Sequence, residues 1–168
     1  MSNDRNIVIT GFMGTGKTTV GQLVAAQLNR EFIDTDAEIV RRTGRSIPSI
    51  FAQDGEATFR ALEGRLCRFL GAHRGFVIAT GGGMLVDEGN RRVMLASGLV
   101  VCLGASAEAI ERRIGDTADD RPLLRKDWQA LLERRLVAYA AIPHQIDTTD
   151  KTPETVAEEI VALWQQFM

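Results

Sequence analysis

The chain has 168 residues, of which 45% are hydrophobic and 25% are charged, and its formal net charge is −2. This length and apolar content predict one domain, residues 1–168, with a sizeable buried core. A slightly acidic chain is a poor electrostatic match for a polyanion, which argues against a nucleic-acid partner. The N-terminal apolar run, Ile7 to Ile9, is too short for a membrane span or a signal-peptide core. We expect a cytoplasmic protein with neither nucleic acid nor membrane as a partner, and we expect a monomer.

Short apolar runs with many β-branched residues alternate along the chain with longer stretches of helical period. The predicted strands are 6–10, 31–34, 76–79, 99–103 and 145–148. The predicted helices are 17–28, 37–42, 58–70 and a last one that opens at Thr152-Pro153-Glu154, where a capping threonine precedes a proline. This alternation is typical of βαβ units, so we predict an α/β protein with a buried parallel sheet.

The segment 115–125, Gly-Asp-Thr-Ala-Asp-Asp-Arg-Pro-Leu-Leu-Arg, breaks this pattern. It is polar, it contains glycine and proline, and it lies between two helical stretches. Such a composition predicts a loop rather than another helix. We interpret residues 112–125 as a mobile lid that is inserted in the domain.

The first predicted strand runs directly into Gly11-Phe12-Met13-Gly14-Thr15-Gly16-Lys17-Thr18, a complete phosphate-binding P-loop. Its three glycines let the backbone turn tightly and point successive N–H groups at phosphate oxygens. The helix that starts at about Lys17 adds its N-terminal dipole to this anion site. We expect Lys17 to bridge the β- and γ-phosphates and the Thr18 hydroxyl to ligate Mg²⁺. The loop therefore predicts a nucleoside triphosphate, ATP in a kinase, together with Mg²⁺.

Two other classes of nucleotide-binding protein do not fit the sequence. The glycines do not follow the GxGxxG spacing, which argues against a dinucleotide site. A regulatory GTPase would need a guanine-reading NKxD and a switch DxxG, and the chain contains neither sequence. A small-molecule kinase is the interpretation that we favour.

The second predicted strand ends in Phe32-Ile33-Asp34-Thr35-Asp36, which we expect next to the P-loop in a parallel sheet. Two carboxylates at a spacing of two point to the same side of a strand that stays extended. One of them can hold Mg²⁺ through water while the other accepts a proton from a hydroxyl group. On local grounds one alternative stays open, in which Asp36 is an acidic helix N-cap and Asp34 is merely solvated.

The third predicted strand ends in Thr80-Gly81-Gly82-Gly83 rather than in an acidic residue. Three glycines at the carboxyl end of a strand permit a ligand to approach the backbone closely, at the edge where α/β sheets bind substrates. A flexible turn is the alternative. The missing acid at this position makes Asp34 the better candidate for organising the metal.

Several motifs, in order and spread over nearly the whole chain, resemble those of the shikimate kinase family. The set comprises the P-loop, Asp34-Thr35-Asp36, Gly55 to Arg60, Gly81-Gly82-Gly83, Arg121-Pro122-Leu123-Leu124 and Arg135 to Tyr139. The resemblance implies a three-layer αβα fold with a five-stranded parallel sheet, as in the nucleoside-monophosphate kinases. It also implies transfer of the ATP γ-phosphate to the 3-hydroxyl of shikimate, within the biosynthesis of aromatic amino acids.

The resemblance also assigns an acceptor site. Arg60 and Arg135 match the family's carboxylate-binding arginines, whose planar forks can pair bidentately. Asp36 matches the acid that engages the ring hydroxyls, and it is our candidate for the general base. Gly82, between its two glycine neighbours, matches the backbone contact to the substrate. Arg134 is adjacent to Arg135, and the spacing to Tyr139 favours Arg135 as the arginine that faces the substrate. The proline that family members usually have between this arginine and the tyrosine is missing here.

The nucleotide site is assigned in the same way. Its residues are Gly14, Thr15, Gly16, Lys17, Thr18, Thr19, Arg113, Arg121 and Lys151. Arg121 matches the family's lid arginine, which approaches the phosphates on closure and adds to the positive charge of Lys17 and Mg²⁺. Closure also excludes water. Arg113 and Lys151 fall where family members contact adenine, and Asp116, Asp119 and Asp120 would partly offset the charge of Arg121.

Two alternatives stay open beside this interpretation. The first is a kinase of a related carboxylate-bearing polyol, such as aminoshikimate or gluconate, although a gluconate kinase should lack the Asp-Thr-Asp and triple-glycine pair. The second is a non-catalytic nucleotide-binding relative. Such a relative would be free to lose Lys17, Thr18, Asp34, Asp36 and Arg121, and all five are present.

Overall fold

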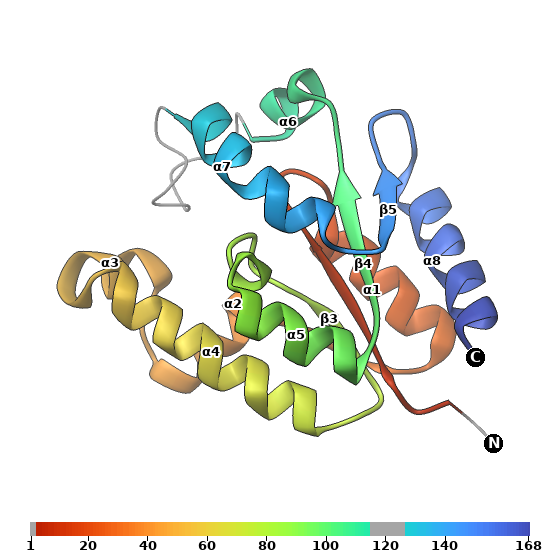
Figure 1. Ribbon diagram of the computed structural model, residues 1–168, viewed down its shortest axis with the longest axis horizontal. Coiled ribbons are helices and arrows are strands. Elements are labelled where there is room, and N and C mark those ends of the chain that lie inside the picture. The colour runs from red at the N-terminus through yellow and green to blue at the C-terminus, as the bar shows by residue number, and fades with distance from the viewer. Residues whose placement is uncertain (1–2, 115–126) are drawn as a thin grey trace.

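A five-stranded parallel sheet forms the centre of the molecule, in the order β2-β3-β1-β4-β5 (Figure 1). The computed structural model describes residues 3–114 and 127–168. The strands are β1 Asn6–Gly11, β2 Glu31–Asp34, β3 Phe76–Ala79, β4 Gly98–Gly104 and β5 His144–Asp147. In β1, Ile7 is in register with Val77 of β3 and Leu99 of β4, so the strand before the P-loop is the central one.

Helices cover both faces of this sheet. They are α1 Lys17–Leu28, α2 Thr35–Thr43, α3 Ile47–Asp54, α4 Glu56–Ala72, α5 Glu88–Ser97, α6 Ala107–Ile114, α7 Trp128–Ala140 and α8 Pro153–Phe167, with a short 3-10 helix η1 at Met84–Val86. Ile7 and Ile9 of β1 pack against α1 and α8, whereas Val8 packs into the core formed with α4, α5 and α7. Figure 1 shows α1 and α8 together on one flank, and α4 beside α5 on the other.

The predicted three-layer αβα architecture is confirmed, and each predicted strand is correct to within one residue at either end. The last helix begins as expected, because Thr152 accepts a hydrogen bond from the Thr155 N–H and Pro153 follows it. Helices α3 and α5 were not predicted. Of the expected lid, residues 112–114 form the last turn of α6, and the remainder, which includes Arg121 and the three lid aspartates, lies outside the described residues.

The sheet brings three functional segments to one edge. The carboxyl end of β1 leads into the P-loop, that of β2 into α2, and that of β3 into the glycine segment, Gly81 to Gly83. Because all strands are parallel, these three ends lie at the same edge of the sheet. Within 3–114 and 127–168, no helix combines the length and the apolar character that a membrane crossing requires.

Candidate active site

The phosphate loop connects β1 to α1, and its glycines determine its shape. Gly14 and Gly16 have φ values of 78° and 88°, in the left-handed region that favours glycine. A Cβ atom on Gly11 would lie closer than 3.0 Å to the carbonyl oxygen of Leu103 on β4. The loop therefore leaves the sheet where there is no space for a side chain, and helix α1 begins at Lys17 as predicted.

Two side chains of the loop stabilise its backbone conformation through hydrogen bonds to loop carbonyl oxygens. Lys17 Nζ donates hydrogen bonds to the carbonyl oxygens of Gly11, at 2.8 Å, and of Phe12, at 3.1 Å. The buried Thr15 hydroxyl also donates to the Phe12 carbonyl, at 2.7 Å. Thr15 thus uses its hydroxyl to shape the backbone and has only its N–H to offer a phosphate. Thr19 is exposed in the first turn of α1.

Thr18 and Asp34, the predicted metal ligands, are in direct contact. Thr18 Oγ1 donates to Asp34 Oδ2 at 2.8 Å, and Asp34 Oδ1 accepts from the Ala37 N–H at 3.0 Å. A hydroxyl and a carboxylate supply the oxygen ligands that Mg²⁺ prefers, and Mg²⁺ completes its shell with water and substrate phosphates. Among residues 3–114 and 127–168, no group of three or more His, Cys, Asp or Glu side chains is placed to hold a metal. The pair therefore fits Mg²⁺ that arrives with a nucleotide.

The segment Phe32 to Asp36 lies next to the P-loop as expected, because Thr18 contacts Asp34, although strand β3 separates β2 from β1 in the sheet. The expected arrangement of the two carboxylates along one extended strand is wrong. The extended strand ends at Asp34, because its carboxylate caps α2, so Asp36 lies in the first turn of the helix. The N-cap is thus Asp34, and the alternative with Asp36 as the cap is wrong as well.

A cavity of about 280 Å³ joins the phosphate loop to the predicted acceptor residues. It is lined by Met13, Lys17, Thr18, Asp34, Asp36, Ile47, Phe51, Phe59, Arg60, Glu63, Thr80, Gly81, Gly82, Gly83 and Arg135. Every described residue that we predicted as catalytic, metal-binding or acceptor-binding borders this one space. We call it the acceptor cavity.

Each glycine of the glycine segment lies against at least one charged side chain of the acceptor cavity. A Cβ atom on Gly81 would lie 2.6 Å from Asp36 Oδ1, and one on Gly82 would lie 3.0 Å from Arg135 Nη1. A Cβ atom on Gly83 would lie closer than 3.0 Å to the Arg60 guanidinium. None of the three has a positive φ. The close approach of these side chains, rather than the backbone conformation, therefore requires glycine here.

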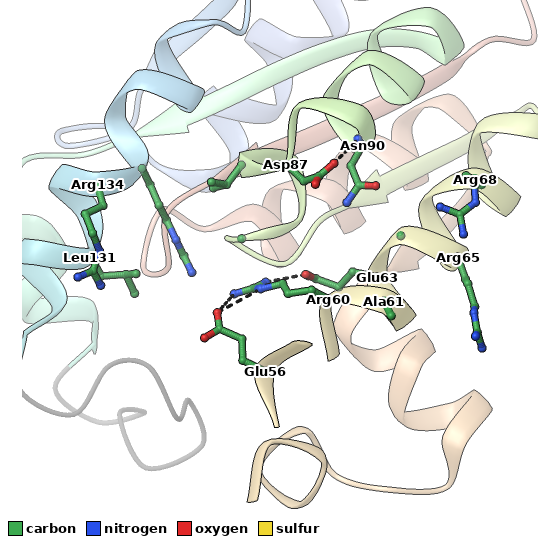
Figure 2. A pocket seen from close by; sticks show the side chains of 14 residues that line it. Glu56, Arg60, Ala61, Glu63, Arg65, Arg68, Asp87, Asn90, Leu131 and Arg134 are labelled. Atoms are coloured by element: carbon green, nitrogen blue, oxygen red, sulfur yellow. Dashed lines mark hydrogen bonds and ion pairs between the residues drawn. The ribbon is translucent and has the colours of Figure 1, made fainter. Parts of the chain in front are cut away.

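Arg60 forms ion pairs with two carboxylates of its own helix, α4 (Figure 2). Its Nη1 lies 2.6 Å from Glu63 Oε1, and its Nη2 lies 3.2 Å from Glu56 Oε1. The Glu63 side chain is 1% exposed, and its Oε2 has no hydrogen-bond partner among the described residues. Burial, with a smaller contribution from the nearby Asp36, raises the pKa of Glu63 to about 7 against the opposing charge of Arg60. Glu63 was not predicted from the sequence, although its i,i+3 spacing from Arg60 is a signal for such a pair.

Arg135, and not Arg134, borders the acceptor cavity. Arg135 is 5% exposed, its Cζ lies 5.8 Å from the centroid of the Phe12 ring, and its Nη1 has no hydrogen-bond partner among the described residues. Tyr139, one turn later on α7, donates its hydroxyl to the Gly82 carbonyl at 2.6 Å. Burial raises the pKa of Tyr139 to about 12, so this hydroxyl stays protonated and donating. Arg134 is exposed.

A family model described as shikimate kinase matches residues 13–165. The chain belongs to the shikimate kinase family. The shikimate kinase of Geobacter sulfurreducens is 47% identical to it over 165 residues, which cover 95% of this chain and 90% of that protein. The shikimate kinase of Pelotomaculum thermopropionicum is 43% identical over 162 residues, 94% of each chain. The structure of shikimate kinase from Acinetobacter baumannii in complex with shikimate has a TM-score of 0.92 at 35% identity, and the match covers 98% of this chain and 94% of that one.

Two residues that the shikimate kinase resemblance places at adenine lie away from the acceptor cavity. Arg113 of α6 donates to the carbonyl oxygens of Gly14, at 2.9 Å, and of Thr148, at 3.1 Å. It thereby ties the phosphate loop to the turn after β5. Lys151, in the same turn region, forms an ion pair with Glu159 of α8 at 2.9 Å.

The apolar wall of the acceptor cavity was not predicted from the sequence. Ile47 and Phe51 of α3, with Phe59 of α4, line the acceptor cavity, and the rings of Phe51 and Phe59 have centroids 5.0 Å apart. An apolar wall excludes water and strengthens the electrostatic interactions of the charged groups opposite it. It was missed because α3, on which two of these residues lie, was not predicted.

Proposed function

We propose that this member of the shikimate kinase family transfers the γ-phosphate of ATP to the 3-hydroxyl of shikimate, yielding ADP and shikimate 3-phosphate. The observation that carries the proposal is the acceptor cavity. It has a phosphate loop at one end, and a carboxylate with two arginines at the other. Such a space suits an acceptor that bears both hydroxyl groups and a carboxylate. The product would then feed the biosynthesis of aromatic amino acids.

The donor half of the site belongs to the P-loop. Its backbone N–H groups and the start of α1 bind the phosphates, and Lys17 supplies the positive charge for the moving group. To reach the phosphates, Lys17 exchanges its two loop carbonyl partners for phosphate oxygens. Thr18 and Asp34 would hold Mg²⁺, Asp34 through a water, and the ion would neutralise charge that develops on the phosphate oxygens.

The acceptor half consists of side chains from α2, α4 and α7. Arg60 and Arg135 bind the acceptor carboxylate, which anchors one end of the ring. Asp36 orients the hydroxyl and accepts its proton as the hydroxyl oxygen forms the new bond to the γ-phosphorus and the bond to the β,γ-bridging oxygen breaks. The backbone of Gly82 contacts the ring. The apolar wall keeps water, a competing acceptor, away from the phosphate.

Three further residues complete the proposed nucleotide site. Arg121 approaches the phosphates as the lid closes and stabilises the charge of the transition state. Arg113 and Lys151 contact adenine. The position of Arg113 supports its proposed contact with adenine, because Arg113 links the phosphate loop to the turn that carries Lys151.

The proposal is tested by coupled ADP release with ATP, Mg²⁺ and a panel of acceptors. The panel contains shikimate, quinate, aminoshikimate and gluconate, with a sample without acceptor as the control for ATP hydrolysis. We expect shikimate to give the highest kcat/KM. Equal or better turnover of another acceptor would reassign the substrate, and ADP release that no acceptor stimulates would indicate a nucleotide-binding protein without kinase activity.

A further inference from the structure

A second and larger cavity, of about 840 Å³, lies on the other side of Arg60. Its walls come from α4, the start of α5 and α7, and it shares Arg60, Glu63, Gly83 and Arg135 with the acceptor cavity. Figure 2 shows Arg65 and Arg68 at one side of this space, Arg134 at the opposite side, and the Arg60–Glu63 pair between them. We call it the outer cavity. Its volume is in the range of small-molecule sites.

Three arginines of the outer cavity lack the partners that most described arginines have. Most described arginines donate to a carboxylate or a backbone carbonyl, as Arg92 does to Glu88. Arg65, Arg68 and Arg134 form no hydrogen bond or ion pair with another described residue. A guanidinium that faces a hollow without a carboxylate partner is available to an anionic ligand.

The carboxylates of the outer cavity do not neutralise these arginines. Five arginines and three carboxylates line it. Glu56 and Glu63 are both paired with Arg60, and Asp87 caps α5 by accepting from the Asn90 N–H at 2.9 Å. The lining therefore has an excess of positive charge, and that excess is located on the unpaired guanidinium groups.

Two glycines of the lining allow arginine side chains to lie close to the backbone. A Cβ atom on Gly64 of α4 would lie 3.4 Å from Arg68 Nη1, so the Arg68 side chain folds back over its own helix onto the small residue one turn earlier. At the inner end, the Arg60 guanidinium lies against Gly83 and separates the two cavities. A ligand in the outer cavity thus meets the same guanidinium that would bind the acceptor carboxylate.

We propose that the outer cavity is an accessory binding site for a small organic anion with two or more separated acidic groups, such as a polycarboxylate or a phosphorylated acid. Arg65 and Arg68 bind one acidic group, and Arg134, with Arg60 and Arg135, binds another. Occupancy weakens acceptor binding, because two anions then compete for the charge of Arg60 and Arg135. The coupling is reciprocal, so the acceptor weakens binding of the accessory anion equally. The effect on acceptor binding rests on the proposed function.

The test measures the Kd of shikimate by isothermal titration calorimetry with and without citrate, at an ionic strength matched with NaCl. ATP and Mg²⁺ are left out, so that chelation by citrate has no influence. We expect citrate to raise this Kd about threefold to tenfold in the wild type. In the double variant Arg65→Gln/Arg68→Gln the rise should be less than twofold. Arg112→Gln is the matched control, because Arg112 is exposed on α6, also has no described partner and lies outside the cavity, and it should behave as the wild type.

An equal rise in the double variant would overturn the proposal, because citrate would then compete inside the acceptor cavity. No rise in the wild type would overturn the coupling.

A second arm uses 3-phosphoglycerate in place of citrate, and separates a preference for phosphate from one for polycarboxylates. Binding of citrate without any acceptor is also followed by NMR of ¹⁵N-labelled arginine side chains. The signals of Arg65 and Arg68 are identified by their loss in the variants. Shifts of these signals with citrate support the site even if shikimate is not the substrate, and their absence would refute it.

Discussion

The two ends of the acceptor cavity are built in different ways. The donor end is a single run of residues between β1 and α1, and we propose that it binds phosphate mainly with backbone groups. The acceptor end needs side chains from three helices, α2, α4 and α7, which meet at the glycine segment. The donor end is therefore determined by local sequence, whereas the acceptor end depends on how distant helices pack against the sheet.

The electrostatics of the two ends also differ. At the donor end, Lys17 contacts carbonyl oxygens of its own loop, and these weak partners are easily exchanged for phosphate. At the acceptor end, Arg60 is held by two carboxylates, one of which is almost fully buried. A substitution of Lys17 at the donor end should therefore alter phosphoryl transfer, and one that displaces an arginine at the acceptor end should alter recognition of the acceptor.

The largest effect that separates the two ends is expected for Lys17→Met. Loss of a charge that stabilises the moving phosphoryl group should lower kcat about 10²- to 10³-fold. The Kd of shikimate should change less than about threefold, because Lys17 does not bind the acceptor carboxylate. Steady-state kinetics and calorimetry measure the two quantities. A comparable loss of shikimate affinity would show that the two ends are not independent.

A smaller effect is expected at the acceptor end for Gly83→Ala. The new Cβ would displace the Arg60 guanidinium, which is the far end of a flexible side chain, so the melting temperature should change little. The KM of shikimate should rise about 10- to 100-fold, as expected when one charge-assisted contact is lost. Gly104→Ala is the matched control, because a Cβ there has no atom within 4 Å and its φ is not positive. An unchanged KM in Gly83→Ala would remove Arg60 from the acceptor site.

The smallest effect concerns the pH dependence of shikimate binding. The acceptor carboxylate brings a negative charge close to Glu63 and should raise the pKa of this residue above its value of about 7 in the free protein. The complex then binds a proton, so affinity should fall about threefold to tenfold as the pH rises from about 6 to about 8. Calorimetry over this range measures it. In Glu63→Gln the profile should be flat, and a slope that persists in that variant would assign the titration to another group.

Much of the donor end could be predicted from the sequence, and less of the acceptor end. The position and backbone conformation of the P-loop were predicted, because its eight residues are contiguous and its glycines are required by local backbone geometry, and its binding of phosphate stays a prediction. The relation between Asp34 and Asp36 was predicted wrongly. Spacing along an extended strand does not reveal that Asp34 stops the strand by capping a helix. The role of Arg121 stays a prediction.

The acceptor end could be predicted from the sequence only in part. Arg60 and Arg135 were assigned only through the family resemblance, and Glu63 was missed because its significance depends on burial. The glycine segment was predicted to admit a ligand, and the structure adds that it admits Asp36, Arg135 and Arg60 as well. These contacts join residues that are distant in sequence, so no local pattern records them.

The central claim is that Asp36 acts on the acceptor hydroxyl and not on the metal. The most direct test is Asp36→Asn, with kcat measured together with the Kd of Mg·ATP. We predict that kcat falls about 10²- to 10⁴-fold, the contribution of a general base, while the Kd of Mg·ATP stays within about threefold of the wild type. A Kd of Mg·ATP that rises as much as kcat falls would contradict this account and would make Asp36 an organiser of the metal.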